Sequence, residues 1–141
     1  MGSAGWKFAL SGAAMWAVGT VFFYFRAGHT FERGPLLYAI NASATVLLFV
    51  LAFRGLAIAF KAPRAQWCAG ALCFILPGML GEIPILLNFS RTLPTLAPGS
   101  GANYAAFLFC GYAAVGLYAL TGGVTRDTKT AGSSSPGMGA R

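Results

Sequence analysis

The stretch QWCAGALCFILPGMLGEIPILLNF, residues 66–89, holds one charged side chain, Glu82, in an otherwise apolar run. A helix needs about 20 apolar residues to cross the hydrocarbon core of a bilayer, and inside lipid the backbone must satisfy its own hydrogen bonds. Similar apolar runs lie at residues 8–25, 36–60 and 102–124. The pattern predicts an all-α fold, a four-helix transmembrane bundle within residues 1–124.

The composition excludes an ordinary soluble domain. The chain is 57% hydrophobic and 9% charged, whereas soluble domains are about 25% charged. Residues 125–141 have no apolar periodicity, so we expect a flexible polar C-terminal tail there. The three cysteines all fall in apolar runs and lack metal-ligand spacing, so we expect neither a metal nor a cofactor.

The net charge of +7 would suggest nucleic acid as the partner of a soluble protein. Here the basic residues separate the apolar runs, and the lipid bilayer is the expected partner rather than nucleic acid. With a cytoplasmic N-terminus, the inner side would hold Lys7, Arg54, Lys61, Arg64, Arg126, Lys129 and Arg141. The outer side would hold Arg26, Arg33 and Arg91. The positive-inside rule therefore predicts that both termini are cytoplasmic.

The sequence leaves the length of the second span and part of the helix packing open. Arg54 interrupts the second run, and Gly55–Phe60 either completes that span or lies along the membrane surface. The short turn Lys61–Arg64 predicts that the second and third spans are antiparallel neighbours.

Small residues recur at Ala9, Ala13 and Ala17 and at Ala102, Ala106, Cys110 and Ala114. Such stripes let helices approach closely, either inside the bundle or at a dimer seam. A homo-oligomer or a partner membrane protein therefore stays open.

The surroundings of Glu82 are unusual for a membrane span. Pro77, Gly78, Gly81 and Pro84 flank it, and each proline removes a helical hydrogen bond, so we expect a break or kink in this helix. A charged carboxylate at this depth costs about 2.5–3.5 kcal/mol. Glu82 should therefore face the bundle, be paired or be protonated, and the sequence leaves its charge open.

Depth arithmetic predicts the neighbours of Glu82. At about 1.5 Å per residue, Glu82 lies roughly 10 Å from the outer end of its span. Asn41 and Thr20 lie at a similar depth, and Tyr104 is somewhat shallower. These four residues form a candidate intramembrane polar site. It is either a proton- or cation-binding site or a set of hydrogen bonds that orients the helices.

The first outer loop, residues 26–33, contains the single histidine, His29, three residues before Glu32. The two could form an acid/base pair at the membrane surface that acts on a lipid or quinone headgroup. A solvated loop explains the same residues. No second histidine or nucleophile motif accompanies them, so we assign no catalytic residue and expect a protein that is not an enzyme.

Three pieces of sequence carry a family resemblance: FRAGHTF at residues 25–31, LPGMLGE at residues 76–82, and Leu93–Pro94 before the last span. Together they resemble a family of small bacterial four-span membrane proteins catalogued only as a domain of unknown function. The resemblance covers about residues 8–123 and implies a bacterial inner-membrane location but no activity. The small multidrug-resistance exporters differ, because their essential Glu lies in the first span, where this chain has no acid.

These observations order three functional hypotheses. The leading expectation is a multi-pass membrane protein that serves as a structural or accessory membrane subunit. The alternative is a small proton- or cation-coupled transporter or channel that uses Glu82. The third is a lipid- or quinone-modifying membrane enzyme that uses His29 and Glu32.

Overall fold

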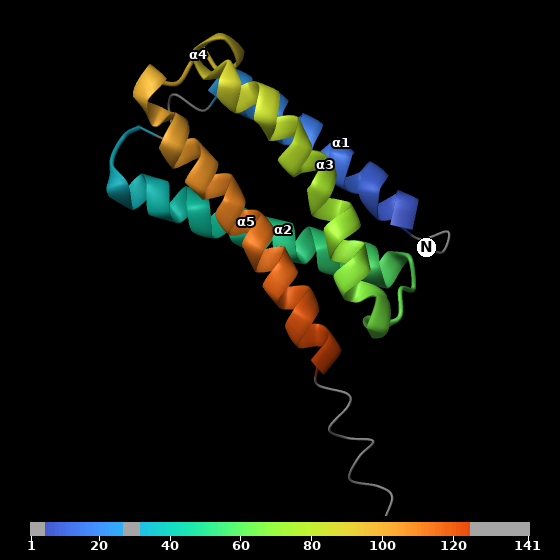
Figure 1. Ribbon diagram of the computed structural model, residues 1–141. Coiled ribbons are helices and arrows are strands. Elements are labelled where there is room, and N and C mark those ends of the chain that lie inside the picture. Colours follow the sequence, from blue (N-terminus) through green and yellow to red (C-terminus); the bar gives the residue numbers. More distant parts are fainter. Residues whose placement is uncertain (1–4, 27–31, 125–141) are drawn as a thin grey trace, which may run out of the picture.

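The computed structural model describes residues 5–26 and 32–124, and these residues form helices without a strand. The long helices are α1 (Gly5–Arg26), α2 (Pro35–Ala59), α3 (Trp67–Leu87) and α5 (Gly101–Val124). Short helical turns lie at η2 (Arg64–Gln66), α4 (Phe89–Thr92) and η3 (Pro98–Ser100). All four long helices are apolar and long enough to cross a membrane. The protein is a multi-pass membrane protein, and the predicted all-α fold is confirmed (Figure 1).

The end of α3 differs from the sequence prediction. This helix stops at Leu87 instead of continuing to Phe89, which begins α4. Asn88 leaves the helical conformation, with φ −120° and ψ 35°, and its side-chain Nδ2 donates to the Pro84 carbonyl at 3.2 Å. Asparagine side chains compete with the backbone for hydrogen bonds in this way and favour helix ends.

The second helix continues through Arg54. Its side chain is exposed, and the helix extends beyond it to Ala59, with Phe60 as the capping residue. Gly55 to Ala59 are therefore a continuation of α2 rather than a separate segment. The predicted tail at residues 125–141 lies outside the described residues.

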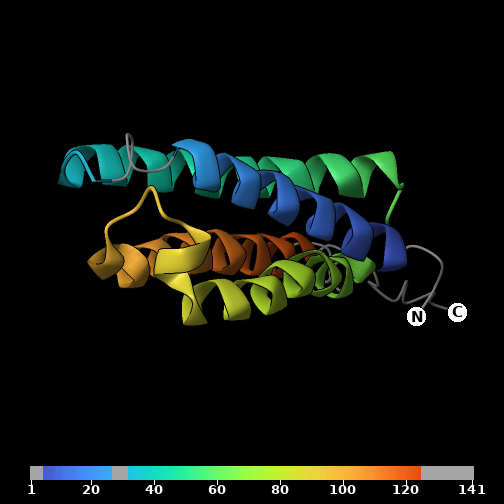
Figure 2. The same ribbon diagram turned by 90° about the horizontal axis from the view of Figure 1, so that it is seen from above.

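Helix packing follows an order that differs from the chain order. α1 packs along α3, α3 also packs on α5, and α5 packs on α2 (Figures 1 and 2). Among the described residues, α1 has no extended contact with α2 or α5, and α2 contacts α3 only slightly. The prediction that the second and third spans are close neighbours is therefore largely wrong. Membrane helices choose neighbours by surface fit rather than by loop length.

Most of the small-residue stripe of α5 does not form its packing face within the bundle. In α5 the buried residues include Tyr104, Phe107 and Val115, whereas Ala102, Ala106 and Cys110 of the stripe are exposed. In α1 the buried residues are Phe8 and Gly12. Large aromatic side chains that fit against glycines fill much of the interior.

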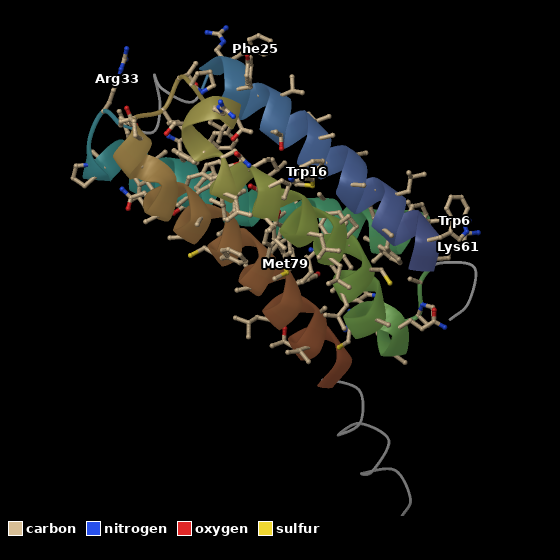
Figure 3. The ribbon with its side chains drawn as sticks, turned by 45° about the horizontal axis from the view of Figure 1, so that its top comes forward. Trp6, Trp16, Phe25, Arg33, Lys61 and Met79 are labelled. Carbon is tan, nitrogen blue, oxygen red and sulfur yellow. The ribbon has the colours of Figure 1, made fainter. Side chains whose placement is uncertain are left out.

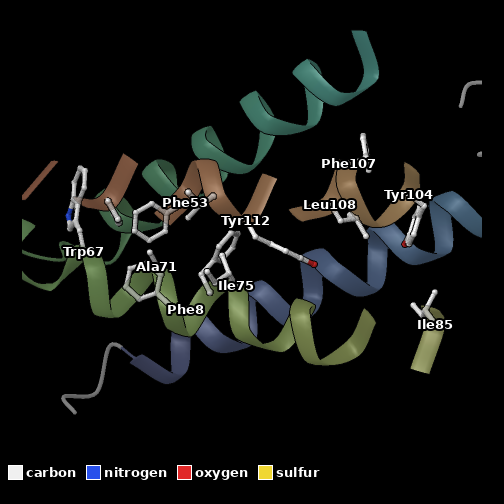
Figure 4. Packing of buried hydrophobic residues seen from close by; sticks show 14 of the residues in the cluster. Phe8, Phe53, Trp67, Ala71, Ile75, Ile85, Tyr104, Phe107, Leu108 and Tyr112 are labelled. Carbon is white, nitrogen blue, oxygen red and sulfur yellow. The ribbon is translucent and has the colours of Figure 1, made fainter. Parts of the chain in front are cut away.

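An aromatic cluster joins the start of α1 to the end of α2. The ring of Phe8 lies 5.7 Å from that of Phe53 and 5.3 Å from that of Phe60. Phe53 also contacts the Trp67 ring at 6.1 Å (Figure 4). Trp6 and Lys61 lie at this end of the bundle, and Phe25 and Arg33 lie at the opposite end (Figure 3). The cluster closes the bundle at the first of these ends.

The connection between α3 and α5 covers the opposite end. Leu93 and Leu96 in this connection are buried. Thr95 Oγ1 donates to the carbonyls of Phe23 and Tyr24, each at 3.3 Å. The last carbonyls of a helix have no partner within the helix, so the one hydroxyl hydrogen that these two carbonyls share partly satisfies the end of α1 and ties the connection to it.

Helices α1 and α3 approach closely where Gly12 of α1 lies against Phe74 of α3. A Cβ built on Gly12 would lie 1.9 Å from the carbonyl oxygen of Phe74. A backbone atom cannot move aside as a side chain can, so only glycine allows this approach. The long interface between α1 and α3 depends on it.

We predict that Gly12→Ala destabilises the protein. Alanine favours a helix over glycine by about 1 kcal/mol, but overpacking costs about 1–3 kcal/mol and here meets backbone. Thermal unfolding in detergent micelles should therefore occur at a lower temperature. The matched control is Gly19→Ala on the same helix, where an added Cβ meets nothing within 4 Å. Equal melting temperatures for the two variants would contradict the proposed helix contact.

Candidate functional site

Glu82 lies on the buried side of α3, with 2% of its surface exposed. Its Oε1 accepts a hydrogen bond from Trp16 Nε1 of α1 at 3.0 Å and a longer one from the Tyr104 hydroxyl of α5 at 3.5 Å. Its Oε2 is buried and has no hydrogen-bond partner among the described residues. The acid thus faces the interior with one oxygen engaged and one oxygen open.

The residues predicted to break α3 have another role. The helix continues through Pro77, Gly78, Gly81 and Pro84, and Figure 1 shows a bend rather than an interruption. A Cβ on Gly81 would lie 2.5 Å from the Trp16 ring, and one on Gly78 would lie 2.5 Å from the Tyr112 hydroxyl. The helix therefore has the predicted kink and is not broken, because a helix in lipid keeps its remaining hydrogen bonds. The glycines instead bring aromatic groups against α3.

Glu82 lies in the wall of a cavity of about 550 Å³. All four residues of the candidate polar site, Thr20, Asn41, Glu82 and Tyr104, line this cavity. They come from α1, α2, α3 and α5, in that order. The structure thus brings the four side chains to one place, whereas their role in binding stays a prediction. Pockets of about 300–1,000 Å³ are typical of small-molecule sites.

Only a few of the described side chains that line the cavity carry polar groups. Thr20 Oγ1 is buried and has no hydrogen-bond partner in the described part of the chain. Asn41 Nδ2 donates to the Leu37 carbonyl of its own helix at 2.9 Å. Trp16 of α1, Thr45 of α2 and Tyr112 of α5 complete the set. The Tyr112 hydroxyl points along the bundle toward the end where Tyr104 lies (Figure 4).

Sequence reasoning missed Trp16, the closest hydrogen-bond donor to Glu82. Tryptophan near a span end is typical of the headgroup region, as for Trp6, but Trp16 lies in the middle of α1. An indole N–H at that depth needs a partner, because lipid supplies none. A tryptophan and an acid at mid-span depth are therefore a signal that could have paired the two residues.

Positive charge is absent from the cavity wall, since none of the described residues that line it is Lys or Arg. Arg54 is exposed on α2 and does not line the cavity. Among the residues that the structure describes, no group of His, Cys, Asp and Glu could hold a metal ion. The buried carboxyl therefore has no cationic partner from these stretches.

Glu32, the acid of the third hypothesis, binds the connection between α3 and α5. Its Oε1 accepts hydrogen bonds from the Ser100 hydroxyl at 2.5 Å and from the Ala97 backbone N–H at 2.7 Å. These two bonds, the Ser100 bond foremost, hold the pKa of Glu32 below its usual value of 4.5. A negatively charged carboxylate at the start of η3 and α5 also interacts favourably with the positive end of the helix dipole. His29 lies outside the described residues.

We predict that Glu32 stabilises the protein in a pH-dependent way. Because its folded pKa is lowered, its contribution is complete above about pH 4.5 and is lost as the pH falls through the folded pKa. Glu32→Gln should therefore melt at a lower temperature than wild type at pH 7, and the difference should disappear in acid. Melting curves in micelles across this range test the point. A difference that is the same at every pH would exclude the charge as its cause.

Comparison with known proteins gives one assignment. No curated protein and no solved structure matches the chain. The model of a family of unknown function, DUF5367, matches residues 30–127. The matched region includes three of the long helices and the acid at Glu82. The chain belongs to this family of unknown function, DUF5367.

Proposed function

We propose that the protein is a small transporter that binds a proton or a cation at Glu82. The observation that supports this most strongly is the Oε2 atom of Glu82, which is buried and lacks a partner in the described residues. It belongs to a carboxyl in the wall of a cavity of about 550 Å³. Ionisable residues within membrane spans commonly mark ion or proton pathways.

The cost of a charged carboxylate at membrane depth favours a Glu82 side chain that binds either a proton or a cation. An ionised carboxylate at membrane depth costs about 2.5–3.5 kcal/mol, and the described residues provide neutral donors to one oxygen only. The charge is best compensated by a proton or by a cation from outside the protein. Because the two occupants compete for one carboxylate, binding of one releases the other, which is the basis of coupling.

Other polar atoms of the cavity would assist a desolvated cation. Thr20 Oγ1 has no partner among the described side chains, and the hydroxyl of Thr45 and the side-chain oxygen of Asn41 are further acceptors. They come from α1 and α2, whereas the acid comes from α3. Ligands from several helices allow binding to respond to helix movement.

We also propose where the protein lies in the cell and how it is oriented in the membrane. The protein would lie in the bacterial inner membrane with both termini cytoplasmic, because the larger group of basic residues is then inside. It would act without a cofactor and not as an enzyme. The exposed stripe of Ala102, Ala106 and Cys110 supports a second copy or another membrane protein as the partner.

A structural or accessory subunit is the second candidate, and a specific observation favours it. Glu82 receives hydrogen bonds from Trp16 of α1 and Tyr104 of α5 and so links three helices. Such a link would orient the helices without any transport. In this case the acid would stay in one protonation state over the working pH range.

We expect infrared difference titration in lipid to show that Glu82 titrates. Wild type should give a carboxyl signal that changes with pH and with added cations, and Glu82→Gln should lack it. Glutamine keeps the acceptor for Trp16, so the fold should be retained. The matched control is Glu32→Gln, which removes an acid outside the spans and should keep the signal. A carboxyl that never titrates and ignores cations would reject transport and favour the structural role.

A further inference from the structure

The surface around the cavity shows where a ligand could enter. Of the residues that line it, those from α3 and α5 are buried or half-buried, and the exposed ones come from α1 and α2. Val18 is 71% exposed and Phe22 53% exposed on α1, and Leu48 is 59% exposed on α2. A residue that both lines a cavity and is exposed lies at its rim. The opening is therefore lateral, between α1 and α2.

Both ends of the bundle are closed by other residues. At one end, Phe8 packs between Phe53 and Phe60. At the other end, the Tyr104 ring packs against two rings, with centroid distances of 5.7 Å to Phe89 and 5.3 Å to Phe23. The side surface of a spanning bundle faces lipid. A ligand would therefore reach Glu82 from the hydrocarbon of the bilayer rather than from water.

The residues that line the cavity favour the binding of a cation with a large apolar part. The carboxyl of Glu82 provides negative charge, and no described lining residue provides positive charge. Aromatic rings attract cations through their faces, and the cavity is lined by Trp16, Phe23, Phe49, Tyr104, Phe107 and Tyr112. A phospholipid would bring a phosphate that nothing on this wall neutralises. The wall thus favours a free organic cation over a lipid.

We infer that the ligand is a lipophilic organic cation that enters from the bilayer between α1 and α2. This inference rests on the function proposed above, because the cation occupies the carboxylate that a proton would otherwise hold. Neither a proton nor an inorganic ion needs an aromatic cavity of about 550 Å³. The cavity volume and the lateral opening are explained by an apolar ligand.

Binding of tetraphenylphosphonium to the protein in lipid nanodiscs tests the ligand class, with empty nanodiscs as the blank. Wild type should bind it, and Glu82→Gln should bind it about tenfold more weakly or worse. Gly19→Trp should also lose binding, because Gly19 lines the cavity and its Cβ meets nothing within 4 Å, so the indole fills the space. The matched control, Gly55→Trp, lies on exposed α2 surface outside the cavity and should bind as wild type does.

A neutral compound of similar shape, triphenylphosphine oxide, tests the role of charge. It should bind far more weakly than the cation to wild type. Equal binding of the two compounds, unaffected by Glu82→Gln, would overturn the inference in favour of a neutral apolar ligand. Absence of tetraphenylphosphonium binding would also overturn it. If Glu82 still titrates in the infrared experiment, the proposed function survives that failure.

Fluorescence quenching tests the route. The emission of Trp16 is obtained as the difference between wild type and Trp16→Phe. Lipids brominated on their acyl chains should quench this emission through the lateral opening, whereas iodide in the water should not. Quenching by iodide without quenching by the brominated lipids would show access from water and reject entry from the bilayer.

Discussion

The hydrogen bond from Trp16 Nε1 to Glu82 Oε1, at 3.0 Å, is the interaction on which the interior of this bundle depends. It joins α1 to α3 at a depth where lipid offers no partner to either group. Two close approaches make it possible, because Gly12 lets α1 reach α3 and Gly81 leaves room for the indole ring. With one oxygen held in this way, the second oxygen of Glu82 lies buried in the wall of the cavity.

The cavity follows from the order in which the helices pack. α1 packs along α3 and has no extended contact with α2 or α5 among the described residues. Phe8 and the connection between α3 and α5 close the two ends, so the remaining space opens to the side. A bundle with α1 packed against both α2 and α3 would have no such opening. The same packing that holds Glu82 thus leaves the space beside it.

The sequence predicts the features that depend on position along a helix. Four apolar runs give the four long helices, and depth arithmetic brings Thr20, Asn41 and Tyr104 to the same cavity as Glu82. Features that depend on how helices fit together are not predictable in this way. The neighbour of α1 and the packing roles of Gly78 and Gly81 require knowledge of which surfaces meet. The bond from Trp16 to Glu82 is an exception, because the mid-span depth of both residues is a signal in the sequence. In lipid, apolar residues lie on every side of a helix, so hydropathy does not mark the packing face.

The hydrogen bond between Trp16 and Glu82 lies within the membrane-spanning part of the bundle. Solid-state NMR in lipid bilayers tests it directly through the dipolar coupling between the ¹⁵N-labelled indole of Trp16 and the ¹³C-labelled carboxyl of Glu82. We expect a measurable coupling, because the indole nitrogen lies 3.0 Å from Oε1 and therefore close to the carboxyl carbon bonded to it, and the absence of the signal in Trp16→Phe assigns it to this residue. A protein that is folded in lipid but shows no coupling between these two groups would contradict it.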